Sequence, residues 1–150
     1  MPVSTRTEYA TRALLELALA DASRPVKTSE IAQRQRIPKK YLEQILLTFK
    51  KGGFVRSKPG LHGGFTLARS SEQISIAQIV RAVDGPLAPV RCVSQSAYTA
   101  CTCPDEGTCP LRETWREARD AMVQVLEGVS LASVARRARV LGTEQTLTSI

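Results

Sequence analysis

The spacing of apolar residues changes from helical to alternating within residues 28–68, and this change constrains the fold most strongly. Two helices are predicted first, and Ile37-Pro38 separates them because the residue before a proline avoids helical geometry. The second helix begins near Pro38 and is closed by Gly52-Gly53. Its apolar residues recur at helical spacing and are Tyr41, Leu42, Ile45, Leu46 and Phe49. This pattern indicates a helix-turn-helix unit.

From Phe54 onward the apolar period becomes two, which is typical of strands. One strand is predicted over residues 54–58 and a second over residues 65–68. The turn between them is rich in glycine and contains Pro59, Gly60, His62, Gly63 and Gly64. A helix-turn-helix followed by such a hairpin is a winged helix. We therefore expect a mainly α fold with a small β-hairpin wing.

Helices are also predicted on both sides of this unit. The first is expected to end near residues 23–25, and another short helix covers residues 75–83. The predicted N-caps are Ser4 or Thr5 for the first helix, and Thr28 or Ser29 for the first helix of the helix-turn-helix.

A long helix is predicted from Pro110 onward because one narrow apolar stripe runs along it. The stripe consists of Leu111, Trp115, Ala118, Met122, Val125 and Val129. Such a narrow stripe is typical of a helix-pairing seam. We divide the chain into a winged helix-turn-helix domain (1–85), a cysteine-containing loop (86–109), a dimerisation helix with a C-terminal helix (110–141) and a flexible tail (142–150).

Most of the positive charge lies on the helix-turn-helix and the wing. Residues 24–69 contain eleven Lys or Arg and two acids, which gives +9 there against +7 for the whole chain. Lys and Arg placed on phosphates release condensed counterions, so a charge excess confined to one unit is the footprint of a nucleic-acid-binding face. A merely solvated face is the alternative. The uneven ratio favours a nucleic acid as the partner, and a helix-turn-helix points to double-stranded DNA.

The N-terminal end of the second helix is predicted to enter the major groove, as recognition helices do. The candidate DNA-contacting residues are Thr28, Ser29, Lys39, Lys40, Tyr41, Glu43, Gln44, Lys58 and His62. The first two lie at a helix N-terminus, which suits a phosphate, and the last two lie on the wing, which is expected to follow a minor groove. Gln44 suits adenine and Glu43 suits cytosine. Tyr41 is either a DNA contact or part of the core.

The sequence also favours a cytoplasmic regulator over other classes of protein. No stretch approaches the roughly 20 apolar residues that cross a bilayer, and residues 1–10 lack the apolar segment of a signal peptide. We therefore expect no membrane partner. The sequence has no nucleophile paired with a base and no phosphate-binding loop, so we expect neither an enzyme nor a small-molecule substrate. The one histidine, His62, is expected to contact DNA or solvent rather than a metal.

Four cysteines cluster in the irregular segment before the long helix. They are Cys92, Cys101, Cys103 and Cys109, separated by eight, one and five residues. In a reducing compartment such a cluster indicates metal binding or redox chemistry rather than structural disulfides. Thiolates are soft ligands that favour iron–sulfur clusters or zinc. Cys109 precedes Pro110 and is expected near a helix N-cap, where the macrodipole lowers the pKa of a thiol.

Several motifs are distributed over nearly the whole chain. They are Glu8-Tyr9-Ala10, Tyr41-Leu42-Glu43-Gln44-Ile45-Leu46, Gly63-Gly64-Phe65-Thr66-Leu67-Ala68, and Cys109-Pro110-Leu111 with Trp115. Together they resemble the IscR/NsrR family of winged-helix transcription regulators, many of which sense through an iron–sulfur cluster. The resemblance implies a homodimer, paired through the long helix, that reads a partly palindromic operator. Family members often have Arg just before the first glycine of the wing; this chain has Pro59 there, and Lys58 is the substitute.

The resemblance also implies a ligand set for a 2Fe-2S or 4Fe-4S cluster. Cluster-binding members use three cysteines, which here correspond to Cys92, Cys103 and Cys109, with Cys101 as an alternate or fourth ligand. Some members add an acid near the start of the first helix, donated by the other subunit, and Glu8 stands at that position. An ordinary acid in the first turn of a helix is the alternative for Glu8.

Other interpretations of the same residues stay open. Structural zinc is one, although the spacing lacks the Cys-x-x-Cys pairs of zinc sites. A thiol switch is another, with Cys101 and either Cys103 or Cys109 forming a disulfide. A third is a protein-interaction module, in which the winged helix binds a protein partner and the cysteines are only redox-labile.

Overall fold

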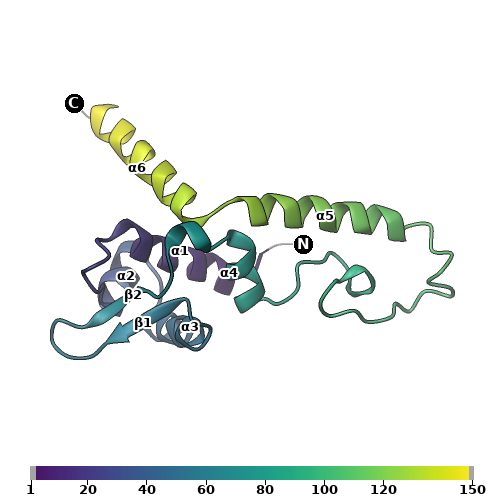
Figure 1. Cartoon of the computed structure of the whole chain (residues 1–150), viewed down its shortest axis with the longest axis horizontal. Coiled ribbons are helices and arrows are strands. Elements are labelled where there is room, and N and C mark those ends of the chain that lie inside the picture. The colour runs from purple at the N-terminus through teal and green to yellow at the C-terminus, as the bar shows by residue number, and fades with distance from the viewer. Residues whose placement is uncertain (1–2, 149–150) are drawn as a thin grey trace.

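The first half of the chain folds as a helix-turn-helix with a two-stranded wing, and the second half carries a long loop and two helices (Figure 1). The computed structural model describes the backbone of residues 3–148 and the side chains of residues 3–142. The first half comprises α1 (Thr5–Leu19), α2 (Thr28–Gln35), α3 (Lys39–Lys51), β1 (Val55–Lys58), β2 (Gly64–Leu67), the 3₁₀ helix η1 (Ser71–Gln73) and α4 (Ile76–Val83). The second half comprises the 3₁₀ helix η2 (Arg91–Val93), α5 (Arg112–Gly128) and α6 (Leu131–Thr148). The mainly α winged helix-turn-helix predicted from the sequence is confirmed.

Aliphatic side chains of α1, α2 and α3 form the main core, and the wing and α6 complete it. Leu14 and Leu46 are fully buried because their spacing puts them on the faces of α1 and α3 that meet. Phe49 and Phe54 pack with 5.2 Å between ring centroids, which ties the end of α3 to the wing. Leu131, the first residue of α6, is fully buried in the same core. The position of α3 is therefore fixed from several sides.

The observed helix boundaries match the predicted ones at Ser4 and differ from them at two other positions. Ser4 caps α1 by accepting a hydrogen bond of 3.1 Å from a backbone N–H of the first turn. Helix α1 ends at Leu19, earlier than predicted. The prediction that Thr28 or Ser29 caps α2 was wrong, because Lys27 occupies the N-cap position without a side-chain hydrogen bond. Thr28 and Ser29 are instead the first two helical residues.

The wing is an antiparallel hairpin attached to the entrance of α2. Lys58 pairs with Gly64 at the outer end of the hairpin. The backbone of Phe65 exchanges hydrogen bonds of 2.8 and 2.9 Å with that of Val26, just before α2. This bridge sets the orientation of the wing relative to the helix-turn-helix.

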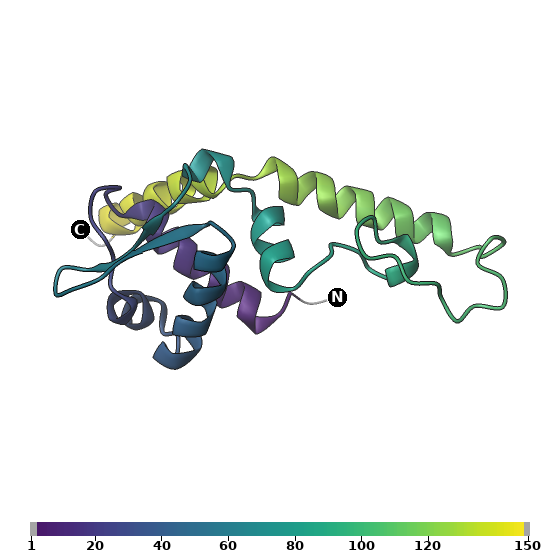
Figure 2. The same ribbon diagram turned by 60° about the horizontal axis from the view of Figure 1, so that its bottom comes forward.

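Helix α5 extends away from the winged helix, and the cysteine-containing loop runs alongside it (Figures 1 and 2). None of the residues of α5 is fully buried. Its inner side joins α4 in a small cluster made of Ile76, Ala77, Val80, Leu87, Met122, Val123 and Leu126. Helix α6 continues to Thr148, so the predicted helix end at residue 141 was wrong. Residues 149 and 150 of the predicted tail lie outside the described residues.

Within residues 3–148, no helix has both the length and the apolar character needed to cross a membrane.

Candidate nucleic-acid interface and cysteine loop

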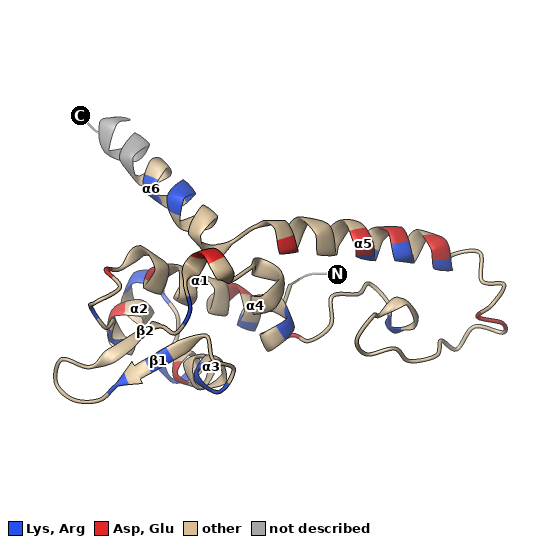
Figure 3. Cartoon of the chain, viewed as in Figure 1, with Lys and Arg blue, Asp and Glu red and all other residues tan. Residues whose placement is uncertain are grey.

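Helix α3 presents a polar, mainly basic face to solvent at its N-terminal end. Lys39, Lys40, Glu43 and Gln44 are exposed, whereas the opposite face of the helix is buried. Pro38 occupies the N-cap position, so the fixed φ of proline sets the start of the helix. Lys and Arg of α3 and of the wing lie at the same end of the molecule (Figure 3). Four of the side chains predicted to read DNA are therefore accessible together.

Tyr41 takes part in the packing of α3 on α1. Its ring meets the ring of Tyr9 edge to face, with 5.7 Å between centroids and an interplanar angle of 83°, an arrangement that aromatic pairs prefer. Arg12 lies 5.3 Å from the centroid of the Tyr9 ring. Tyr41 is half-buried against the main core. Its ring orients the recognition helix, and part of the side chain stays accessible.

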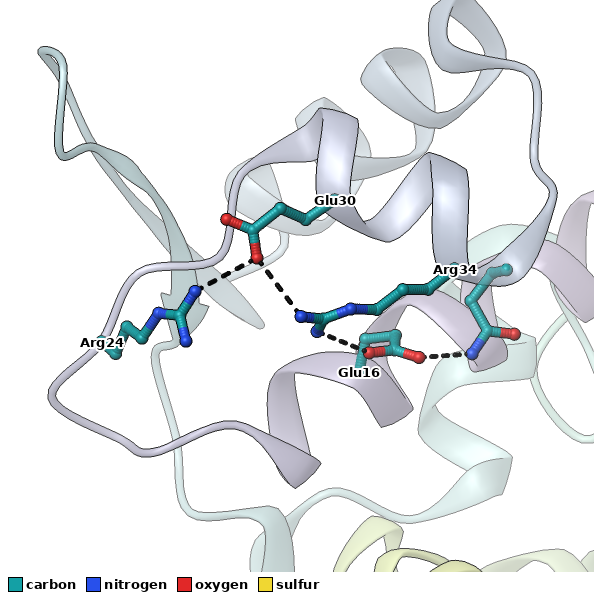
Figure 4. A network of polar contacts seen from close by, with 5 residues as sticks. Glu16, Arg24, Glu30 and Arg34 are labelled. Carbon is teal, nitrogen blue, oxygen red and sulfur yellow. Dashed lines mark hydrogen bonds and ion pairs between the residues drawn. The ribbon is translucent and has the colours of Figure 1, made fainter.

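A network of charged side chains fastens α2 to α1 (Figure 4). Glu16 of α1 lies 3.4 Å from Arg34 and accepts a hydrogen bond of 2.6 Å from Gln35. Glu30 lies 3.5 Å from Arg24 and 3.6 Å from Arg34. Each exposed ion pair contributes only about 0.2–1 kcal/mol, but the network restricts how α2 sits on α1. Arg24 and Arg34 are partly neutralised, so the positive charge of this part of the chain lies mainly on α3 and the wing.

A polar hollow of about 440 Å³ separates the wing from the start of α2. Lys27, Lys58 and His62 line it, and all three side chains are exposed. Thr28, which is half-buried, and Ser29, which is exposed, follow Lys27 directly. The structure thus brings the two wing residues predicted to contact DNA close to the first turn of α2.

Two other cysteines of the loop before α5 influence the thiol of Cys103. A hydrogen bond with the side chain of Cys101 and the repulsion between two adjacent thiolates raise the pKa of Cys103 to about 11, and Cys109 adds to the shift. Cys103 is exposed, whereas the other cysteines are half-buried. Cys92 lies in the separate helix η2 and is not among the groups that cause this shift. The structure therefore groups Cys101 with Cys103 and Cys109.

Two arginines of α5 hold the cysteine-containing loop. The carboxylate of Glu106 accepts a hydrogen bond of 2.7 Å from the hydroxyl of Tyr98 and lies 3.2 Å from the guanidinium of Arg112. Arg119, two turns further along α5, donates a hydrogen bond to the backbone carbonyl of Val93 in η2. Residues seven apart lie on the same side of a helix, so one side of α5 holds both parts of the loop. Nothing in the sequence pattern predicts these contacts.

The start of α5 differs from the prediction. The helix begins at Arg112 with Leu111 as its N-cap, so Cys109 lies farther from the helix dipole than predicted. The backbone N–H of Arg112 donates to the carbonyl of Cys109 at 3.3 Å. Within residues 3–148, no three His, Cys, Asp or Glu side chains are arranged so that they could hold a metal ion. The donor chemistry of the loop suits an iron–sulfur cluster, because thiolates are its usual ligands, but the described side chains are not gathered into a ligand set.

Glu8 is exposed in the first turn of α1 and lines an apolar groove of about 850 Å³. The groove runs between α1, α4 and α5, and Leu87, Met122 and Leu126 contribute to its wall. No cysteine lines this groove. Within the part of the chain that the structure describes, Glu8 and the cysteines are therefore not brought into one site.

The apolar stripe of α5 faces solvent. Leu111, Trp115 and Val125 are 59%, 38% and 63% exposed, although large apolar side chains are usually buried. Met122, in the middle of the stripe, is half-buried against the small cluster with α4. An exposed stripe with this spacing is what a helix-pairing seam requires.

Two exposed leucines were missed by the sequence analysis. Leu47 of α3 and Leu61 at the tip of the wing are 51% and 80% exposed. Leu47 departs from the helical spacing of the buried residues, and Leu61 stands in a glycine-rich turn. Either signal could have identified them.

Comparison with known proteins matches nearly the whole chain to one family. The model of the family described as "Rrf2: Iron-dependent Transcriptional regulator" matches residues 3–137. Protein rrf2 of Nitratidesulfovibrio vulgaris is 38% identical over 138 residues, which are 92% of this chain and 89% of the relative. The HTH-type transcriptional regulator IscR of Cronobacter sakazakii is 30% identical over 141 residues, 94% of this chain and 84% of the relative.

Solved structures extend the similarity to three dimensions. CymR, the global cysteine regulator of B. subtilis, aligns with a TM-score of 0.76 at 28% identity and covers 91% of this chain and 98% of its own. IscR of T. potens aligns with a TM-score of 0.73 at 26% identity and covers 92% of this chain and 88% of its own.

Proposed function

The chain belongs to the Rrf2 family of transcriptional regulators, and from this premise we propose that it is a homodimeric regulator whose affinity for a partly palindromic operator is controlled by the cysteine loop, residues 92–109. Its relatives are transcriptional regulators and not enzymes. The observation that supports DNA reading most directly is the exposed end of α3, where Lys39, Lys40, Glu43 and Gln44 stand beside a basic wing.

In this proposal the N-terminal end of α3 enters the major groove. Gln44 binds adenine through its amide and Glu43 accepts from the amino group of cytosine. Lys39 and Lys40 neutralise phosphates or reach guanine. The first turn of α2, with Thr28 and Ser29, approaches a phosphate. Lys58 and His62 carry the wing along the adjacent minor groove.

The exposed stripe of α5 supports the homodimer. Burying Leu111, Trp115 and Val125 against a second copy removes apolar surface from water, which is favourable by about 25 cal/mol per Å². Two chains related by a twofold axis present two α3 helices, so a twofold operator matches the symmetry of the protein.

We propose an iron–sulfur cluster as the sensor. Cys92, Cys103 and Cys109 supply thiolates, with Cys101 as an alternate or fourth ligand, and Glu8 adds an oxygen ligand across the dimer. The contact of Cys101 with Cys103 supports a direct role for Cys101. When bound, such a cluster supplies a centre that responds to redox state, nitric oxide or iron supply. Arg112 and Arg119 tie the loop to α5, so reordering of the loop shifts the two recognition helices relative to successive grooves.

A thiol switch is the second candidate, and the contact of Cys103 with Cys101 and Cys109 favours it. Hydrogen peroxide would take two electrons and two protons from two thiols, forming one S–S bond and two water molecules. The disulfide would then hold the loop in a second arrangement.

Two experiments test these proposals. Protein purified without oxygen should contain iron and sulfide and absorb broadly in the visible region, and Cys103→Ala should lose that absorbance; stoichiometric zinc, or reversible thiol oxidation without metal, would point to the alternatives. Selection from a randomised duplex library should yield a preferred sequence whose affinity falls steeply with salt. If no preferred sequence emerged, with or without metal, the proposal that the protein is a sequence-specific regulator would be refuted.

A further inference from the structure

The tip of the wing is a tight turn that presents one apolar side chain to solvent. The backbone N–H of Gly63 donates to the carbonyl of Gly60 at 3.0 Å, which makes Leu61 and His62 the two central residues of a β-turn. Leu61 is 80% exposed, more than any other large apolar residue among residues 3–142. Contact with water is unfavourable for a leucine side chain, so its exposed position in this polar turn needs another explanation.

The backbone holds this leucine in its outward position. Gly60 has a φ of +101°, which favours glycine. Gly63 is buried, and a Cβ built there would lie 2.0 Å from the carbonyl oxygen of Lys58. The turn is therefore closed tightly against its own first strand, and Leu61 projects from the closed end of the hairpin.

A polar hollow lies between the wing and α2. Lys27, Lys58 and His62 line this hollow of about 440 Å³. Glu30 and Arg24 line it too and lie 3.5 Å apart. A DNA phosphate suits such a hollow because Lys27 and Lys58 are cationic, while the carboxylate of Glu30 is paired with Arg24 and Arg34. With a strand held there by its phosphate, Leu61, which directly precedes His62 in the turn, would point past the DNA backbone toward the adjoining groove.

We propose that Leu61 enters the minor groove of the operator as an apolar wedge and favours base steps that unstack easily. A leucine has no group for phosphates or for hydrogen bonds to base edges, so its favourable contacts are with sugars and the faces of partly unstacked bases. Pyrimidine–purine steps such as TA open most easily. Leu61 thus adds specificity at a step that α3 does not contact. This inference rests on the proposed DNA binding.

The test compares Leu61→Ser with Leu61→Met in the full chain. The probe is a duplex that wild-type protein selects from a randomised library, and a scrambled duplex of the same composition is the reference. Leu61→Ser should bind the selected duplex about tenfold more weakly, a typical loss for one specific contact, and the scrambled duplex equally well. Leu61→Met keeps an apolar side chain of similar size at the tip and should bind the selected duplex within about twofold of wild type.

A modified duplex locates the contact. Replacing adenine by 2,6-diaminopurine at the step next to the wing puts an amino group into the minor groove, as guanine does. Wild-type protein should bind this modified duplex more weakly than the unmodified one. Leu61→Ser, which already lacks the wedge, should bind the two duplexes almost equally. Equal binding of the selected duplex by Leu61→Ser and wild type would refute the proposed role of Leu61 but not the proposed DNA binding. A wild-type protein that selects no sequence would refute both.

Discussion

The thiol of Cys103 contacts the thiol of Cys101, and this contact is the main cause that raises the pKa of Cys103 to about 11. Negative charge on one sulfur disfavours a second thiolate beside it. Cys103 therefore holds its proton at neutral pH in the metal-free protein, although the residue is exposed. Its reactivity is suppressed by its neighbours rather than by burial.

Alkylation should reveal this suppression. In metal-free, reduced protein at neutral pH, iodoacetamide should label Cys103 about tenfold more slowly than an ordinary thiol. Its pKa of about 11, two units above the usual 9.0, lowers the thiolate fraction about 100-fold, and the greater nucleophilicity of a more basic thiolate offsets part of that loss. Cys101→Ala should restore faster labelling, measured by mass spectrometry of the peptide. The folded loop holds this proton more tightly than the unfolded chain, so its stability should fall as the pH rises from about 9 through 11. Fast labelling of Cys103 in the wild-type protein would contradict the assignment.

Substitutions on α3 should separate specificity from charge. Gln44→Ala should cost about 1–3 kcal/mol for the preferred operator and relax the choice of base at one position. Lys40→Ala should weaken binding to all duplexes and reduce the salt slope by about one unit for each chain. Arg137→Ala, an exposed change on α6, is the control and should leave binding unchanged. Fluorescence anisotropy at several salt concentrations measures these effects, and a uniform loss from Gln44→Ala would argue against base reading.

The stripe of α5 should hold the dimer together. Trp115→Glu should weaken dimerisation by about 30- to 1000-fold, because an aromatic anchor at an interface is worth about 2–4 kcal/mol. The fold should persist, since Trp115 is 38% exposed in the single chain. Gln124→Glu adds the same charge on the opposite side of α5 and should leave the dimer intact. Sedimentation velocity distinguishes these results, and a Trp115→Glu protein that stays dimeric would exclude this seam.

The wing should depend on Gly63. An added Cβ would lie 2.0 Å from the carbonyl oxygen of Lys58, so Gly63→Ala must open the turn. We expect a local cost of about 1–3 kcal/mol and weaker operator binding with an otherwise intact fold. Gly128→Ala is the matched control, because a Cβ there has nothing within 4 Å. Hydrogen exchange of the wing amides measures the opening, and unchanged exchange in Gly63→Ala would contradict the observed turn.

The fold was largely predictable because its signals are local. The change of apolar period near Phe54 identified the helix-turn-helix and the hairpin. Helix ends were harder, since several neighbouring residues compete for one cap: Lys27, without a capping side chain, occupies the position predicted for Thr28 or Ser29. The length of α6 was underestimated because Gly142 was read as a helix end, whereas the helix continues through it.

The site was less predictable because its contacts join distant parts of the chain. The stretch that supplies the exposed residues of α3 was evident from the sequence, but Glu16 gave no sign that it would pair with Arg34. The same holds for Arg119, whose partner is a backbone carbonyl in η2. The grouping of Cys101 with Cys103 and Cys109 depends on how the loop folds back on itself, which spacing alone does not specify. The DNA contacts and the cluster ligands stay predictions.

The operator affinity of one anaerobic preparation, measured before and after reconstitution with iron and sulfide, tests the central claim most directly. We expect the reconstituted protein to carry a visible absorbance that requires Cys103 and to bind its selected duplex with an affinity at least about tenfold different from that of the metal-free protein, equivalent to about 1.4 kcal/mol of coupling. Identical affinities of the two forms, with the cluster demonstrably bound, would contradict control of DNA binding by the cysteine loop.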